Sequence, residues 1–508
     1  CIIDSICIGC FWFAFSFFSS KPEAGMKAIT NIRLKYFGYF SFLLVAVSAI
    51  SIFLDQSGWL LFSLAVLLCF FIAHRPIIIF YILIASIPWS IEFKVADSFA
   101  SDLPDEPLML LITFSISAFL VYNKMKINFH KIFSPLILLL LLQFAWLGIT
   151  VLFSTNTFVA SKFLIAKSWY LFAFVITPVI LLNNKKRLQT TAWVFSTSII
   201  ICAIVTMYRH SLSGFTFITI NESVEPFFRN HVNYSALLVC TFPIVVAFIN
   251  VAAKKQKVYL FILLMILIAA TYFSYARGAW LAVIIGIITL WLLKKRLLIH
   301  AYILFIIIML SAVIWLKKDD KYIKYAHDYN TTIFHTNFEQ HLVATYQLKD
   351  VSTAERFYRW IAGVRMIKDY WQTGSGPGSF YPIYKGYAIG AFKTWVSRND
   401  DHSTVHNYFL LTLIEQGIIG LLLLLFLIGY LFYTAQNIYR RANDFFWKRT
   451  AAVATVILSM VCTVNFLSDL IETDKIGSVF YLCIAVLIIA NFQTRKELNS
   501  SPNVEGIP

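Results

Sequence analysis

The sequence predicts an all-α protein: a polytopic transmembrane helical bundle of about 12–14 spans with one large outward-facing loop that contains short helices. Three observations predict this class. Of the 508 residues, 59% are hydrophobic and only 13% are charged, and the mean hydropathy is +0.74. Long apolar runs recur from one end of the chain to the other. These runs lack the alternation of barrel strands, so helices are expected to satisfy their backbone in lipid.

Read from Met26, fourteen runs have the apolar character of a span, each ending where charged or turn-forming residues interrupt it. In order they are residues 35–54, 59–73, 76–91, 107–123, 133–153, 163–182, 190–208, 234–252, 258–276, 278–293, 298–316, 412–434, 450–468 and 476–492. The short second and third runs also fit one re-entrant pair, which gives about twelve spans.

Charges in the connections alternate along the chain. Basic clusters occupy every second connection and both ends, whereas acidic residues gather in the others, as in "EFKVADSFASDLPDEP" at 92–107. The positive-inside rule then places the basic set and both termini in the cytoplasm. The 209–233 loop and the long 317–404 loop are expected to face outward. The predicted parts are a bundle over 26–316, a periplasmic loop over 317–404, C-terminal helices over 405–492 and a cytoplasmic tail over 493–508.

The segment before Met26 is predicted to be separate from the bundle. "MKAITNIRLKYFGYF" from Met26 has the basic and then apolar order of a natural start. Residues 1–25 are therefore interpreted as upstream read-through, or the chain as a fragment. A cleaved signal peptide is the alternative, although no basic segment precedes the first apolar run.

The net charge of +16 does not predict nucleic-acid binding. The basic residues lie in short clusters between apolar runs, as membrane topology requires, and no basic stripe with interleaved aromatic residues appears outside the spans. Membrane lipids are the expected surroundings, and no nucleic-acid partner is expected.

Four polar stretches on the outward side are candidates for chemistry: "YARGAW" (275–280), "STAERFYRW" (352–360), "TGSGPGSF" (373–380) and "STVHNYFLLTLIEQGIIG" (403–420). Arg277 is expected at a tight turn that Gly278 permits. Arg277 and Arg356 have forked donors suited to phosphate. His406, at the start of a helix, can accept a proton from a hydroxyl group.

Neighbouring residues in the last stretch have more than one interpretation. Asn407 would orient a partner or cap the helix. Glu415, nine residues after His406, is expected to face away from it and to contact a neighbouring helix.

Simpler interpretations remain open for each stretch. Arg277 is also typical of an arginine that snorkels to the membrane interface. Arg356 and Arg359 would also suit the solvated face of an amphipathic helix. "GSGPG" predicts a flexible turn, because it lacks the ending of a phosphate-binding loop. His406 by itself would be an ordinary helix-start histidine.

A metal site is not predicted. The outward histidines lack metal-ligand spacing. The acidic trio Asp102, Asp105 and Glu106 suggests a metal-dependent transferase as an alternative. Its proline context favours an acidic outer loop instead.

The ordered set resembles the O-antigen ligase and polymerase superfamily. The resemblance covers about residues 150–470 and includes "NFLSD" at 465–469. It implies a metal-independent, inverting glycosyltransferase of the GT-C type that needs no cofactor. Such enzymes transfer a glycan from undecaprenyl pyrophosphate to an acceptor hydroxyl on the periplasmic face of the bacterial inner membrane.

The resemblance also implies roles for particular residues. Arg277 and Arg356 would bind the donor pyrophosphate, and His406 would act as the general base or position the acceptor. The remaining substrate-binding candidates are Arg229, His231, Lys167, Arg359, Asn407 and His402. Many members carry a second histidine where this chain has Thr404, and His402 would replace it only if the loop bends.

The acceptor is left open by the residues. Lipid A core (a ligase), another glycan repeat (a polymerase) and a protein hydroxyl (an oligosaccharyltransferase) all remain, and the large loop late in the chain favours a ligase. A transporter of lipid-linked glycans is the alternative outside enzymes. It is disfavoured because polar residues collect on one side and no internal repeat is found.

Overall fold

A computed structural model describes residues 76–96, 99–122, 134–318, 321, 351–389 and 404–500. The chain divides into two units, residues 1–75 and 76–508, and the description below concerns the second unit. The segment 1–25 and the predicted spans 35–54 and 59–73 therefore lie outside the described residues.

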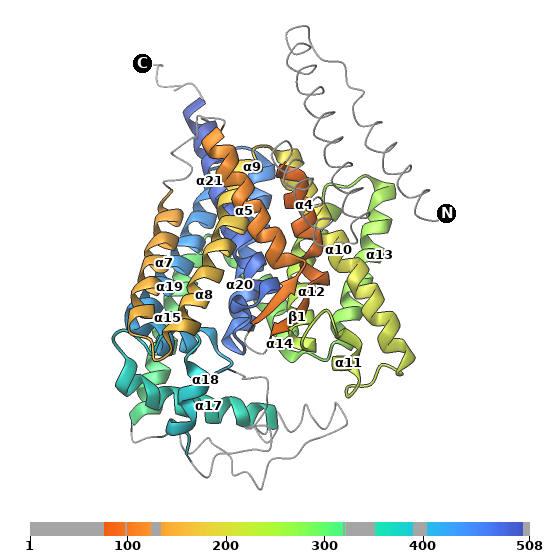
Figure 1. The fold of residues 1–508 in the computed structure, drawn as a ribbon. Helices are drawn as coiled ribbons and strands as arrows, with labels where there is room; N and C mark the ends of the chain where they lie inside the picture. The colour runs from red at the N-terminus through yellow and green to blue at the C-terminus, as the bar shows by residue number, and fades with distance from the viewer. Residues whose placement is uncertain are drawn as a thin grey trace, which may run out of the picture. The chain divides into compact units, whose positions relative to one another are not determined.

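Every later predicted span falls on a helix, which confirms the all-α class (Figure 1). Their bounds are α4 (Pro76–Ser86) with the 3-10 turn η1 (Ile87–Trp89), α5 (Asp105–Tyr122), α7 (Pro135–Leu152), α8 (Thr157–Leu171) continued by η2 (Phe172–Ile176) and α9 (Thr177–Leu181), α10 (Lys185–Leu212), α12 (His231–Ile249), α13 (Lys254–Phe273), α14 (Arg277–Lys294), α15 (Leu298–Lys317), α19 (Tyr408–Arg441), α20 (Phe445–Phe466) and α21 (Asp474–Ser500). Within the described ranges, ten helices are long and apolar enough to cross a membrane.

Polar caps set where many of these helices begin. The side chain preceding the helix accepts a hydrogen bond from a backbone N–H of the first turn at Ser134, Asn156, Asn184, Asn230, Asn407 and Asp444. The first N–H groups of a helix have no partner within it, and leaving them unpaired near lipid is costly. The caps therefore separate the apolar runs from the connections.

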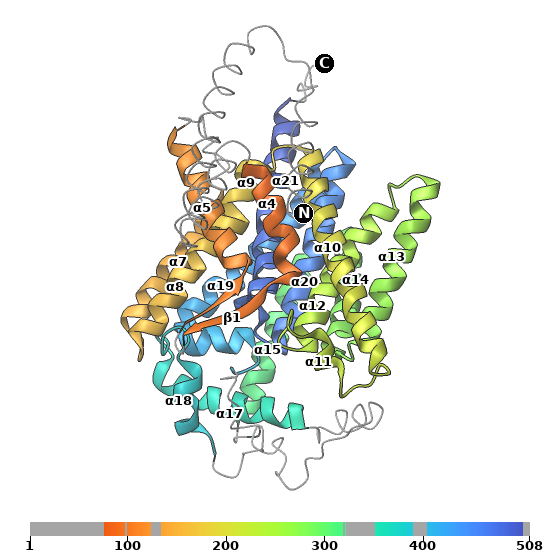
Figure 2. The ribbon, with the colours of Figure 1, turned by 45° about the vertical axis from the view of Figure 1, so that its right-hand side comes forward.

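The basic connections meet at one end of the bundle. Lys185, at the start of α10, pairs with Asp444 between α19 and α20. Glu497 of α21 accepts hydrogen bonds from the backbone N–H groups of Asn443 and Asp444. Four elements lie towards the opposite end: the hairpin of β1 (Ile91–Ala96) and β2 (Phe99–Leu103), α11 (Ile220–Val224), α17 (Val351–Tyr370) and α18 (Phe380–Tyr387) (Figures 1 and 2). This arrangement agrees with the predicted alternation; which end faces outward stays a prediction.

The acidic stretch is not a loop, as the sequence suggested, but a hairpin. Strands β1 (Ile91–Ala96) and β2 (Phe99–Leu103) pair antiparallel, with Ile91 opposite Leu103, and β2 leads almost directly into α5. Apolar and polar residues alternate over residues 91–95 of β1, which is the pattern of a strand, whereas β2 lacks this alternation. The hairpin was missed because the charges, and not this period, decided the interpretation.

The described part of the long loop packs onto the bundle. Buried side chains of α17, α18 and α19 form one apolar cluster: Ala362, Met366, Phe380, Tyr384, Val405, Leu411 and Ile414. Because the cluster joins α17 to the first turns of α19, it fixes the residues of α17 relative to the turn that precedes α19. That turn contains His406.

Candidate functional site

His406 lies in a turn whose backbone is held by α17. Its φ of +54° is in the left-handed region, which costs a non-glycine residue about 1–2 kcal/mol and persists only where surrounding contacts enforce it. Arg359 Nη1 donates to the carbonyl oxygen of Thr404 at 2.9 Å. Trp360 Nε1 donates to the carbonyl oxygen of Val405 at 3.0 Å. These two hydrogen bonds orient the chain immediately before His406.

The segment 465–469 holds the other side of the same turn. Asn407 caps α19 by accepting from Leu410 N at 2.9 Å, and its Nδ2 donates to the carbonyl oxygen of Phe466 at 3.0 Å. Tyr408 N donates to the carbonyl oxygen of Ser468 at 3.0 Å. Of the two interpretations of Asn407, the helix cap is therefore the one that the geometry gives. The "HNY" and "NFLSD" motifs bind each other.

Asp469 is the carboxylate beside His406, and sequence reasoning assigned it no role. The hydroxyl of Thr404 donates to Asp469 Oδ2. His406 Nδ1 lies 3.9 Å from Asp469 Oδ1, close enough to attract a protonated ring but too far for a hydrogen bond. Burial raises the pKa of the Asp469 carboxyl, and the Thr404 hydroxyl opposes that shift. The position of Asp469 at the end of the "NFLSD" motif was the feature of the sequence that pointed to this residue.

Two arginines of α17 set the electrostatics at His406. Burial, and then the positive charges of Arg356 and Arg359, lower the pKa of His406 to about 3. The imidazole is therefore neutral at physiological pH and can accept a proton. Its side chain remains 36% exposed, so a substrate can reach it.

The two arginines differ in their surroundings. Arg359 is only 3% exposed; its Nε lies 3.3 Å from Glu355 Oε2, and its guanidinium lies 5.8 Å from the centre of the Tyr384 ring. The solvated-face interpretation is therefore wrong for Arg359, whose contacts suit a positioning residue. Arg356, one turn earlier, is half-buried and is the stronger of the two in lowering the His406 pKa.

Arg277 is the first residue of α14 and is half-buried. The tight turn before it is made by Tyr275, whose φ is +56°, and not by Gly278 as the sequence suggested. Gly278 lies in the first turn of the helix, where a Cβ would meet Leu467 Cδ1 at 3.8 Å. The start of α14 therefore lies against the 465–469 segment that also holds the His406 turn.

The glycine-rich turn is packed, so the prediction of a flexible turn is wrong. It fits into a break in α19 at Gly417, where φ is +68°. Ser375 N donates to the carbonyl oxygen of Ile414 at 2.9 Å, and Gly376 N donates to that of Glu415 at 3.0 Å. These bonds satisfy carbonyl groups that the broken helix leaves without partners.

Glu415 contacts the first residue of α18, which directly follows this turn, so the expected contact with a neighbouring helix is present. Its Oε1 accepts from Phe380 N at 3.2 Å, and the residue is only 6% exposed. The motifs "GSGPGSF" and "EQG" thus stabilise one structure, which holds α18 and the start of α19 together.

Replacing Gly374 with alanine is expected to destabilise this structure. A Cβ at Gly374, where φ is +78°, would lie 2.2 Å from the carbonyl oxygen of Glu415. The backbone must shift, at a cost of about 3 kcal/mol or more. Thermal unfolding of the purified protein measures the loss. Gly386→Ala is the control, because nothing lies within 4 Å of its Cβ position; equal melting temperatures for the two variants would contradict the packing.

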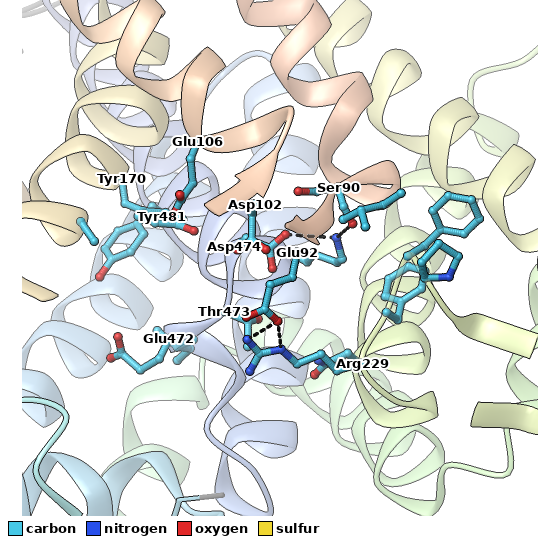
Figure 3. A pocket seen from close by; sticks show the side chains of 18 of the residues that line it. Ser90, Glu92, Asp102, Glu106, Tyr170, Arg229, Glu472, Thr473, Asp474 and Tyr481 are labelled. Carbon is cyan, nitrogen blue, oxygen red and sulfur yellow. Dashed lines mark hydrogen bonds and ion pairs between the residues drawn. The ribbon is translucent and has the colours of Figure 1, made fainter. Parts of the chain in front are cut away.

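Three other predicted residues make their contacts outside the His406 turn. Arg229 donates to Glu92 Oε2 at 2.7 and 3.0 Å. Lys167 pairs with Glu472 at 3.1 Å. Arg229 and Lys167 both line a separate cavity of about 440 Å³ (Figure 3). His231 Nδ1 lies 2.8 Å from Asn221 Oδ1 at the start of α12, and His402 lies outside the described residues.

The acidic trio that suggested a metal-dependent transferase is divided by the structure. In the part of the chain that the structure describes, no three His, Cys, Asp or Glu side chains lie close enough together to hold a metal ion. Asp102 and Glu106 line the cavity, whereas Asp105 is completely buried at the start of α5.

Residues 260–425 match the family model described as O-antigen ligase. The matched segment runs from α13 into α19 and includes Arg277, Arg356 and His406, which confirms the resemblance to the O-antigen ligase superfamily. It ends before Asp469, and it excludes Lys167 and Arg229. The chain has no significant match among curated proteins.

Proposed function

From the O-antigen ligase match, we propose that this multi-pass membrane protein is a glycosyltransferase of the bacterial inner membrane. It transfers a glycan from undecaprenyl pyrophosphate to a hydroxyl of lipid A core at the periplasmic face. The observation that carries the proposal is the His406 turn. A neutral imidazole lies there between a cation, Arg356, and a carboxylate, Asp469.

In the proposed reaction, Arg356 and Arg277 bind the donor pyrophosphate. Guanidinium groups donate paired hydrogen bonds to phosphate oxygens, and in a partly buried site their charge is weakly screened. They stabilise the negative charge that develops as the bond between the sugar anomeric carbon and the pyrophosphate oxygen breaks. Pyrophosphate leaves with its lipid, and no metal ion is required for its neutralisation.

His406 serves as the general base for the acceptor. With Nδ1 turned towards Asp469, its Nε2 accepts the proton of the attacking hydroxyl. The hydroxyl oxygen forms the new bond to the anomeric carbon from the face opposite the pyrophosphate, so the configuration inverts. The proton that the hydroxyl loses resides on His406, whose charged form Asp469 stabilises.

Deletion of the gene in its host separates the proposed ligase from related enzymes. We expect long glycan chains to accumulate on the lipid carrier and to disappear from lipid A, as shown by gel analysis of both lipid fractions. Accumulation of single repeats would instead indicate a polymerase. Loss of protein glycosylation with intact lipopolysaccharide would indicate an oligosaccharyltransferase. Either of these results would contradict the ligase assignment.

A further inference from the structure

A cavity close to the His406 turn is built by other parts of the chain. It is bounded by the β1–β2 hairpin, α8, the segment before α12, η6 (Leu470–Glu472) and the start of α21 (Figure 3). Its volume of about 440 Å³ is within the range of about 300–1,000 Å³ that small-molecule sites occupy. All its lining residues fall outside the segment 260–425 that matches the O-antigen ligase family.

The cations of this cavity are already paired with carboxylates. Arg229 lies 2.7 Å from Glu92, Lys167 lies 3.1 Å from Glu472, and Lys475 lies 3.1 Å from Asp474. The ion pair of Arg229 with Glu92 is visible in Figure 3. Because each cation is held by its own carboxylate, the cavity has no positive charge to spare for a phosphate group.

Besides the exposed Glu225, two further carboxylates line the same space without an ion-pair partner among the described residues. Glu106 accepts only the hydroxyl hydrogen of Ser101, at 2.7 Å. Asp102 lies beside Asp474 (Figure 3). Burial is the main cause that raises the pKa of Asp102 to about 7. The negative charges of Asp474, Glu106 and Glu92 also raise it, and the positive charge of Lys475 opposes them. In their ionised forms both carboxylates only accept hydrogen bonds, so a ligand that donates hydrogen bonds suits them.

Aromatic rings supply the apolar part of the lining. Phe163 and Tyr170 of α8, Phe228 before α12 and Tyr481 of α21 all contribute. A neutral sugar fits this lining, because it donates hydrogen bonds, has no negative charge and presents C–H surfaces to aromatic rings. The donor pyrophosphate is repelled by the same carboxylates.

We propose that this cavity binds an uncharged saccharide unit of the acceptor glycan, whose hydroxyl groups donate hydrogen bonds to Asp102 and Glu106. The proposal rests on the glycosyl transfer proposed above. The short helix η6 connects the two sites: Asp469 precedes it and receives the Thr404 hydroxyl, while Glu472 ends it and lines the cavity. Three residues of 3-10 helix span about 6 Å, so a sugar held here lies near His406.

Two variants of the cavity test the proposal by different means. Ala166→Phe adds a ring to the lining without changing the charge. Asp102→Asn removes a carboxylate but keeps the shape, and it relieves repulsion among buried carboxylates, so folding is not endangered. Glu222→Gln is the control, since Glu222 is an exposed acid of α11 that does not line the cavity.

Binding is measured without turnover, in protein that also carries His406→Ala. Delipidated core oligosaccharide is titrated calorimetrically into each purified variant. We expect both cavity variants to weaken its binding at least tenfold and Glu222→Gln to leave it unchanged, with binding of the lipid-linked donor equal in all. Unchanged oligosaccharide affinity in both cavity variants would overturn the proposal. A failure of the proposed function would appear separately, as absence of glycan transfer by protein that keeps His406.

The pH dependence of the same titration gives a second readout. Because the pKa of Asp102 is near 7, its carboxyl gains a proton as the pH falls from 8 to 6, and one acceptor of sugar hydroxyls is weakened. Oligosaccharide affinity should therefore fall over this range in protein with Asp102 and stay level in Asp102→Asn. A parallel pH dependence in both would contradict the role of Asp102.

Discussion

Replacing His406 with alanine is expected to lower the rate of glycan transfer by a factor of about 10²–10⁴, the usual contribution of a general base. Donor binding should persist, because Arg277 and Arg356 remain. Single-turnover transfer with purified protein measures the rate, and equilibrium binding of lipid-linked glycan measures the affinity. His300→Ala is the matched control, since His300 is an exposed residue at the other end of the bundle.

A pH profile distinguishes a base from a merely structural histidine. In the free protein the pKa of His406 is lowered to about 3 by burial and two arginines, so its neutral form is present at all pH values above that. Bound pyrophosphate offsets the arginine charges and raises this pKa. The acid limb of kcat should therefore lie at higher pH than that of kcat/KM. Near-normal turnover by His406→Ala would refute the assignment.

Replacing Arg356 with glutamine is expected to raise the KM for the donor by a factor of roughly 10–100, because a hydrogen bond to a charged group contributes about 1.5–3 kcal/mol. The KM for the acceptor should stay constant. Arg356→Lys should recover only part of the loss, since an ammonium cannot bind phosphate through two parallel donors. Steady-state kinetics with each substrate varied in turn measures the difference.

The same substitution has a second consequence that a structural defect would not produce. Removing the Arg356 charge raises the pKa of His406, so the acid limb of kcat/KM should move to higher pH. Lys368→Gln is the control on the same helix, because Lys368 is exposed. Equal donor KM values for Arg356→Gln and Lys368→Gln would contradict the role of Arg356.

The helices could be predicted from the sequence because lipid imposes the same length and apolar character on each span. Predictions that depended on contacts between distant segments failed. "GSGPG" suggested a flexible turn, since nothing nearby in the sequence indicates that its N–H groups bond to carbonyls of α19 about 40 residues later. Residues 91–95 alternate as a strand does, but the charges of this stretch favoured its interpretation as a loop.

In the site, too, residue chemistry could be predicted from the sequence, whereas contacts between distant segments could not. His406 and Arg356 were predicted from residue chemistry, and the structure brings them together. Arg359 was expected to bind substrate, but in the structure it donates a hydrogen bond to Thr404. That contact joins residues 45 positions apart and could not be foreseen from the sequence. Arg229 and Lys167 were grouped with the site by charge alone. In the structure they form ion pairs with carboxylates of β1 and η6.

Transfer by the purified protein tests the central claim most directly. Protein in lipid nanodiscs is mixed with undecaprenyl-pyrophosphate-linked glycan and lipid A core, with excess chelator and no ion gradient. The proposed function predicts glycosylated lipid A and one released undecaprenyl pyrophosphate per glycan, and loss of both in Arg277→Ala. No product from the wild-type protein, together with movement of lipid-linked glycan across vesicle membranes that Arg277→Ala blocks, would contradict it and indicate a transporter.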